Sequence, residues 1–517
     1  MARRASYSEG IAFAVLSFAS IVVVGLLSSI LVARAYGIDP VGEYAIALAP
    51  SLALGTLSQL REQAALVRKL ALLEARAPRV TGLFAAVMSF SFGLTVLVAV
   101  PVTAATWLVL DGPVGRDDLF VPALALIGSY ILLENTCWNL DVIFSSFRAG
   151  RSLFWVRLVH GVSFLVYAIG INLTFGDDVW GLVVATAASW LTVVLQRVVL
   201  ARQFMRFRVP GREVREGFRS LGELVRFGAK VAPGMIADGV ARQSSVWVLS
   251  VTSSITAVGA FNRAWLLASR FIDLGHRVTE MLFPTLVERR ASGDREGFDR
   301  VSLDTIRYSI AGMLLPAAVG GGAADGVMDL FGDGFDQAAD ALALLLVVPA
   351  LSAVAAIQTS VLWTDDRPWL STAITSTRAV LTLGLLIVFA SEWGITGAAA
   401  AMVVAYLVDV IWSFAAMRRS WSGPVRRLWP YRGMAAVAVA YAAGFGAARG
   451  VDVALGQEVG TAAALLAGTM AYVFAVFVCG GLVQRDRDRL ALAARRFRER
   501  RALREGVPAA SPGSAGG

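Results

Sequence analysis

Five charged residues within one long apolar segment could bind an anion inside a membrane: Arg263, Arg270, Asp273, Arg277 and Glu280. At about 100° per helical residue, the three arginines fall within about 40° of one another, and the acids widen the charged arc to about 100°. An arginine at the centre of a membrane helix costs about 2.5–3.5 kcal/mol, so three must face water, protein partners or a charged ligand. The segment therefore predicts a helix that lines a polar, cationic cavity.

The two acids of this segment lie within one helical turn of Arg277, with Asp273 before it and Glu280 after it. We expect both acids to stay ionised and to hold the arginines through structural ion pairs. This pairing leaves Arg263 and Arg270 without an acid on their own helix, so these two are the leading candidates for ligand binding.

Other polar residues interrupt neighbouring apolar segments. Asp238 and Arg242 are four residues apart on one helical face, where they either pair with each other or contact the substrate. Glu134 and Asp141 are nearly aligned, and they either carry a coupling proton or sodium ion or pair with arginines from the other half of the chain. Arg34 ends the first apolar segment, as a substrate contact or as a side chain that snorkels to the outer surface.

The sequence offers no pattern for covalent chemistry. It lacks a phosphate-binding loop, a nucleophile elbow, H-E-x-x-H and C-x-x-C. Its two histidines, His160 and His276, are too few for a metal site. We therefore predict a protein that is not an enzyme, with no catalytic residue, no metal and no cofactor apart from a coupling H⁺ or Na⁺.

Composition places these residues in a membrane protein, because 57% of the 517 residues are hydrophobic and only 16% are charged. Soluble domains are closer to 45–50% apolar and 25% charged. About fourteen apolar runs are long enough to cross a bilayer. They lie near 11–34, 41–60, 82–110, 119–140, 153–173, 180–200, 228–251, 257–284, 303–323, 341–363, 371–390, 396–416, 433–449 and 460–483. Asp409, near the end of the twelfth run, is expected at the membrane interface.

The net charge of +9 reflects topology rather than nucleic-acid binding, because basic residues concentrate in alternate loops. These loops lie at 3–4, 61–79, 148–157, 202–219, 289–300, 418–432 and 485–504. By the positive-inside rule both termini are cytoplasmic, which requires an even number of spans. We expect a multi-pass protein of the bacterial cytoplasmic (inner) membrane whose basic tail contacts membrane lipids.

A faint internal repeat suggests how the spans are arranged. Residues 41–44 (VGEY) and residues 258–261 (VGAF) lie 217 residues apart, each after an outward loop. A repeat of six spans preserves orientation, so the halves should be related by an axis along the membrane normal. We predict two pseudo-symmetric six-helix lobes around a central cavity, residues 1–200 and 223–416, joined by a cytoplasmic linker at 201–222. A helix pair at 433–483 and a basic tail at 484–517 follow, with a disordered end.

Six short segments resemble, in order, the polysaccharide biosynthesis (Wzx-type) oligosaccharide flippases of the multidrug/oligosaccharidyl-lipid/polysaccharide exporter superfamily. They are 31–44 (LVARAYGIDPVGEY), 63–68 (QAALVR), 258–261 (VGAF), 282–287 (LFPTLV), 330–335 (LFGDGF) and 393–399 (WGITGAA). Two departures concern substrate and coupling ion rather than fold. Ser244 or Ser245 stands where the family often has an Asp, and Arg61-Glu62 replaces small residues.

The resemblance implies a flippase that moves an undecaprenyl-diphosphate-linked oligosaccharide to the outer leaflet by alternating access. The arginines fit such a substrate, because guanidinium groups bind phosphates bidentately. A polysaccharide polymerase or chain-length regulator is an expected partner.

Three alternatives remain open: a lipid II flippase, a cation-coupled multidrug exporter, and a membrane glycosyltransferase or polymerase. An exporter of cationic drugs would favour an acidic cavity, and a glycosyltransferase would need larger outer loops than these.

Overall fold

A computed structural model describes residues 7–58, 66–67, 69–70, 73–147, 149–206, 211–229, 232–365, 367–418, 421, 431–455 and 457–479. Throughout these ranges the regular secondary structure is helical, with no strand. The predicted disordered end and the basic tail at 484–517 lie outside the described residues. Within them, the chain is an all-helical membrane protein, as its composition predicts.

The helices before the middle of the chain are α1 (Tyr7–Tyr36), α2 (Ile38–Leu57), α4 (Pro78–Asp111), η1 (Asp117–Leu119), α5 (Phe120–Ser129), η2 (Tyr130–Glu134), α6 (Asn135–Ser146), α7 (Gly150–Phe175), α8 (Val179–Ala201) and α9 (Gly211–Ala229). Those that follow are α10 (Ala232–Thr252), α11 (Ile255–Ala291), α12 (Arg295–Gly322), α13 (Ala324–Asp329), η3 (Phe335–Ala338), α14 (Ala339–Leu345), α15 (Val348–Thr364), α16 (Pro368–Met417), α18 (Tyr431–Leu455) and α19 (Gln457–Val478).

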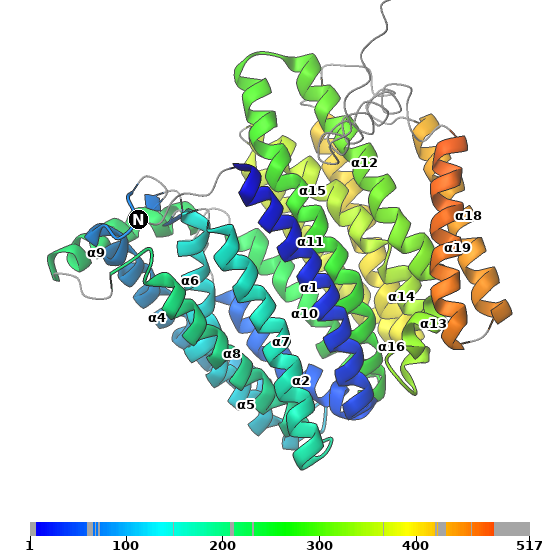
Figure 1. Cartoon of the computed structure of the whole chain (residues 1–517), viewed down its shortest axis with the longest axis horizontal. Coiled ribbons are helices and arrows are strands. Elements are labelled where there is room, and N and C mark those ends of the chain that lie inside the picture. Colours follow the sequence, from blue (N-terminus) through cyan, green and yellow to red (C-terminus); the bar gives the residue numbers. More distant parts are fainter. Residues whose placement is uncertain are drawn as a thin grey trace, which may run out of the picture.

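These helices form two groups, with α18 and α19 at the outer edge of the second group (Figure 1). In the first group α1 packs on α7, and α7 packs on α8. In the second, α10 packs on α16, and α15 packs on α11 and α16. The final pair, α18 and α19, packs on α12. The two groups meet chiefly where α2 contacts α10 and α11.

Several helices are long and apolar enough to cross a membrane. In the described part of the chain eight helices meet this test, and nine do if the bent pair α1–α2 counts as one span. The long helix α16 holds two of the predicted spans, because Gly394 breaks it with a non-helical backbone (φ 54°, ψ −131°). The charged helix α11 carries Arg263, Arg270 and Asp273 in its middle, which lowers its hydropathy. The structure is compatible with fourteen spans.

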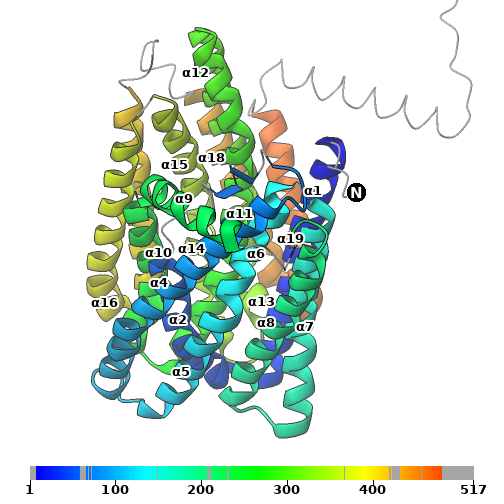
Figure 2. The ribbon, with the colours of Figure 1, turned by 90° about the vertical axis from the view of Figure 1, so that its left-hand side faces the viewer.

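The predicted linker at 201–222 is not a simple loop, because α9 occupies much of it and the following span begins at Ala232 rather than at 228. Helix α9 runs across the upright helices (Figure 2) and packs on α4. Gly82 and Gly217 allow this close crossing, since a Cβ on Gly217 would lie 2.2 Å from the Gly82 carbonyl oxygen. Lys69 Nζ lies 2.7 Å from Glu223 Oε2, and this hydrogen bond lowers the pKa of the Glu223 carboxyl.

The two copies of the repeated motif meet where α2 crosses α11. A Cβ on Gly42 would lie 2.3 Å from the carbonyl oxygen of Ile255, and a Cβ on Gly259 would lie 2.6 Å from that of Ile38. Ile38 and Ile255, which begin the two helices, are separated by the same 217 residues as the two glycines. Such reciprocal contacts are what a two-fold relation between α2 and α11 produces.

Candidate functional site

The main cavity has a volume of about 480 Å³ and lies against the inner faces of α1, α2, η2, α6, α7, α8 and α11. Most of its wall is apolar or aromatic. Its polar and ionisable lining side chains are Ser28, Ser29, Tyr44, Tyr130, Glu134, His160, Thr186, Ser189, Arg263 and Arg270. Because α11 belongs to the second group of helices and the other walls to the first, the cavity spans the boundary between the groups.

Two arginines of α11 enter this cavity. Arg263 is only 7% exposed, and its Nη1 donates a hydrogen bond to Ser29 Oγ of α1 at 3.0 Å. Its Nε is buried without a hydrogen-bond partner. Arg270 lies against Gly25, where a Cβ would be 3.3 Å from its Nη2. Within the described part of the chain neither arginine forms an ion pair with a carboxylate, although Glu134 lines the same cavity.

The sequence places Asp273, Arg277 and Glu280 on the same charged arc of α11. The side chains of Arg277 and Glu280 lie outside the described residues, so the predicted pairs that involve them remain predictions. Asp273 is exposed. Among the described residues it forms no ion pair.

Glu134 reaches the main cavity from a π-helical turn, η2, between α5 and α6. Its Oε2 is buried and has no hydrogen-bond partner. Tyr130, at the start of the turn, packs edge-on against Trp190 with ring centroids 6.1 Å apart. Such π-bulges are rare and occur frequently at functional sites.

Asp141 pairs with an arginine of its own predicted lobe rather than with one of the other lobe. Arg197 of α8 donates to both of its carboxylate oxygens, from Nε at 2.7 Å and from Nη2 at 2.9 Å. Arg197 itself is 5% exposed. A carboxylate held by a bidentate arginine is already neutralised, which leaves Glu134 as the better candidate for ion coupling.

Asp238 and Arg242 pair with each other at 2.6 Å and line a second cavity of about 240 Å³ between α10, α11, α15 and α16. Arg378, which the sequence analysis overlooked, pairs with both Asp238 and Asp409, the latter at 2.9 Å. Its guanidinium carbon lies 4.3 Å above the ring of Tyr406. A lone arginine within an apolar span was the signal that could have found it.

Asp409, which the sequence places near the end of its span, is buried within the protein. It is 4% exposed, accepts a hydrogen bond from Ser413 and is held by Arg378. The second cavity thus carries two arginines and two aspartates that compensate one another, unlike the main cavity.

Arg34 is separate from the other candidate residues. It is exposed, and its Nε donates to the carbonyl oxygen of Leu330 at 2.8 Å. It lines a pocket of about 680 Å³ with the loop from Asp329 to Asp336. The structure does not bring Arg34 together with Arg263 and Arg270.

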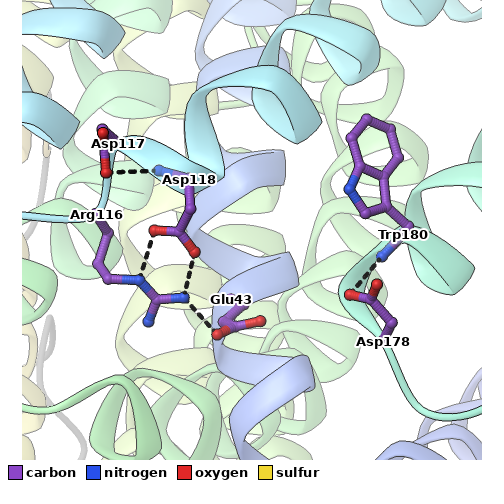
Figure 3. A network of polar contacts seen from close by, with 6 residues as sticks. All are labelled: Glu43, Arg116, Asp117, Asp118, Asp178 and Trp180. Carbon is purple, nitrogen blue, oxygen red and sulfur yellow. Dashed lines mark hydrogen bonds and ion pairs between the residues drawn. The ribbon is translucent and has the colours of Figure 1, made fainter.

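A further ionic contact ties α2 to the loop after α4 (Figure 3). Arg116 lies 2.5 Å from Glu43 and 2.7 Å from Asp118, and these hydrogen bonds raise the pKa of its guanidinium above the usual value. In the same view, Asp178 accepts a hydrogen bond from the backbone of Trp180 and caps α8. Among the described residues, no three His, Cys, Asp or Glu side chains are grouped so that they could hold a metal ion.

Solved structures share this fold, although no family model and no curated protein sequence matches the chain. The lipid II flippase MurJ in an inward closed conformation superimposes with a TM-score of 0.65 at 12% identity, covering 91% of this chain and 99% of that chain. An inward-facing multidrug resistance MATE family transporter of the MOP superfamily gives 0.52 at 18% identity, covering 79% and 94%. An outward-facing MATE transporter gives 0.50 at 18% identity, covering 81% and 96%.

At these identities the likeness concerns the arrangement of helices alone. The chain is an all-helical, multi-pass membrane protein with the transporter fold that MurJ and the MATE proteins share.

Proposed function

We propose that the chain is a flippase that moves an undecaprenyl-diphosphate-linked oligosaccharide from the cytoplasmic to the outer leaflet. The observation that carries this proposal is the pair Arg263 and Arg270, which face the main cavity without a carboxylate partner in the described part of the chain. Burying unpaired arginines is expensive, so a ligand that supplies the missing negative charge is the natural explanation. A diphosphate supplies it, with oxygens that guanidinium groups bind bidentately.

The rest of the cavity suits the remainder of such a substrate. Aromatic walls from Tyr44, Tyr130 and Trp190 offer surfaces for sugar rings, and Thr186 and Ser189 offer hydroxyl groups. The lipid tail would stay in the bilayer while the head group crosses. Alternating access would follow from rocking of the two predicted lobes, residues 1–200 and 223–416, around the site between them.

A lipid II flippase is the second candidate. The MurJ superposition favours this candidate, because it covers 91% of this chain. The two MATE structures described above cover 79% and 81%. Both candidates require a diphosphate site, so the cavity arginines do not separate them. A cation-coupled drug exporter fits less well, because Arg263 and Arg270 would repel a cationic substrate.

Several further features belong to the proposal. The protein would lie in the bacterial inner membrane with both termini in the cytoplasm, and a polysaccharide polymerase or chain-length regulator would receive its product. Glu134 would carry the coupling ion, with Asp141 held in its ion pair. Asp238, Arg242 and Arg34 remain predicted substrate contacts outside the main cavity.

Depletion of the protein in its host, followed by mass spectrometry of lipid-linked glycans, tests the proposal. We expect an undecaprenyl-diphosphate oligosaccharide to accumulate inside while surface polysaccharide falls. Expression of an Arg270→Ala variant at normal membrane levels should fail to restore export. Accumulation of lipid II with arrested cell-wall growth would instead support the second candidate. If neither lipid accumulates and cells become sensitive to cationic drugs, the flippase proposal is wrong.

A further inference from the structure

The main cavity contains one carboxylate as well as its two guanidinium groups. Among the described residues that line it, Glu134 is the one acid. Its Oε2 is buried and makes no hydrogen bond, whereas the neighbouring Asp141 is fully occupied by Arg197. A cavity that suits an anionic ligand thus keeps in its wall a carboxyl group with one buried oxygen that makes no hydrogen bond and with no arginine paired to it among the described residues.

The backbone holds Glu134 in this position. It ends the π-helical turn η2, which interrupts the regular hydrogen-bonding of the fourth span. The turn is fixed from two sides, by the Tyr130 ring against Trp190 and by close contact with Gly55, where a Cβ would lie 2.4 Å from the Tyr130 hydroxyl. Short π-helical turns of this kind occur frequently at functional sites.

We propose that Glu134 must be protonated for the anionic substrate to bind, so that substrate and one proton occupy the main cavity together. This inference rests on the proposed function. An ionised Glu134 repels a diphosphate in the same poorly solvated cavity and competes with it for the guanidinium groups. By linkage, the proton favours the substrate and the substrate favours the proton to the same extent.

Other titratable or charged groups surround Glu134. They are Tyr44 on α2, Tyr130 on η2, Cys137 and Asp141 on α6, His160 on α7, Arg197 on α8, and Arg263 and Arg270 on α11. The arginines stay charged at any working pH. Asp141 is held by Arg197, and Tyr44 is hydrogen-bonded to Thr186 at 2.7 Å. His160 is the remaining group that ordinarily titrates near neutral pH, so it needs its own control.

Binding of the proton together with the substrate determines the direction in which the proton moves. A proton that binds with the substrate is carried in the same direction, whereas an antiporter requires the two to exclude one another. The proton reduces the negative charge that moves outward, and it moves against its own gradient. The membrane potential, negative inside, favours outward movement of the negative charge that remains, so this potential rather than the proton gradient would drive transport.

The test measures binding of a short-chain prenyl diphosphate that carries one sugar to the purified full-length protein. This probe is a diphosphate diester, so its own charge does not change in the range used. Between about pH 8 and about pH 5 the affinity of the wild-type protein should rise at least about tenfold. The Glu134→Gln variant should bind tightly at both pH values. The Glu134→Asp variant should keep the pH dependence, which controls for damage to the fold.

Two further variants test whether His160 causes the pH dependence and whether binding requires Arg270. His160→Gln should keep the wild-type pH dependence, and Arg270→Ala should lose binding at both pH values. The inference is overturned if Glu134→Gln keeps the pH dependence or if His160→Gln abolishes it, while the proposed function would stand. If the wild-type protein binds the probe at neither pH value, the proposed function fails and this inference fails with it.

Discussion

At the scale of single residues, the buried charges of this protein fall into two kinds. Arg197 with Asp141, and Arg378 with Asp238 and Asp409, are compensated within the protein. Arg263 and Arg270 line a cavity without a carboxylate partner in the described part of the chain. Since an uncompensated charge inside a membrane protein is costly, the second kind is where function is expected.

Replacing Arg270 by alanine should lower transport at least about tenfold, because a bidentate phosphate contact is lost. Lysine at this position should restore transport only in part, since it keeps the charge but loses the fork of donors. Transport by reconstituted protein in vesicles measures both effects. Arg219→Ala, at an exposed position of α9, is the matched control and should behave as wild type. Full activity of the Arg270→Ala protein would show that the α11 arginines are structural.

Replacing Asp141 by asparagine should lower the free energy of unfolding by about 3 kcal/mol, because Arg197 would remain buried without its counter-charge. A second change, Arg197→Gln, should recover part of the loss by removing the orphaned charge. Thermal unfolding of the purified protein measures both. Glu216→Gln breaks an exposed pair with Arg212 and should change stability little. Equal unfolding temperatures for Asp141→Asn and Glu216→Gln would contradict this assignment.

At the scale of helices, glycines determine which helices can pack together, because they let two backbones approach closely. The two groups of helices contact each other mainly through α2, which crosses α11 at Gly42 and Gly259. Gly37 turns the chain sharply between α1 and α2, with φ at 78° and a bend of 119° between the helices. These glycines bring α1 and α2 against α11, and so bring Ser29 within reach of Arg263.

Alanine at Gly42 or at Gly259 should each reduce the free energy of unfolding by about 1–3 kcal/mol, because a Cβ would overlap the facing backbone. The two losses should be similar, since the contacts are reciprocal. Gly93→Ala is the matched control: no atom lies within 4 Å of its Cβ position, so stability should stay equal or rise. Chemical or thermal denaturation measures the three variants. A neutral effect at either crossing glycine would argue against the two-fold contact.

At the scale of the whole molecule, alternation of basic loops and apolar spans predicts the orientation in the membrane. The loop between α11 and α12 is flanked by Arg289, Arg290 and Arg295, whereas the loop before η3 carries Asp333 and is followed by Asp336 within η3. These loops lie at opposite ends of α12, which is 28 residues long and so about 42 Å. They should therefore face opposite sides of the membrane.

A reporter fused after Asp294 should be cytoplasmic, and one fused after Gly334 should be extracytoplasmic. Alkaline phosphatase, which is active only outside the cytoplasm, distinguishes the two. Activity from both fusions, or from neither, would refute the topology.

Much of this architecture follows from the sequence alone. The all-helical membrane fold could be predicted because hydropathy and charge are properties of short windows of sequence. That Arg263 and Arg270 share a face of α11 could be predicted because helical periodicity fixes which residues lie on one side of a helix. The repeated motifs at Gly42 and Gly259 indicated related halves before any contact was known.

Which side chains pair across long separations in the sequence was decided only by the tertiary structure. Arg197 lies 56 residues from Asp141, Arg378 lies 140 from Asp238, and Arg263 lies 234 from Ser29. The π-helical turn that delivers Glu134 to the cavity likewise has no simple periodic signature. Hydropathy and helical periodicity determine which side chains face away from the lipid. Which buried charges are compensated, and which remain for a ligand, depends on helix packing, because an ion pair forms only where side chains from separate helices come within a few ångströms.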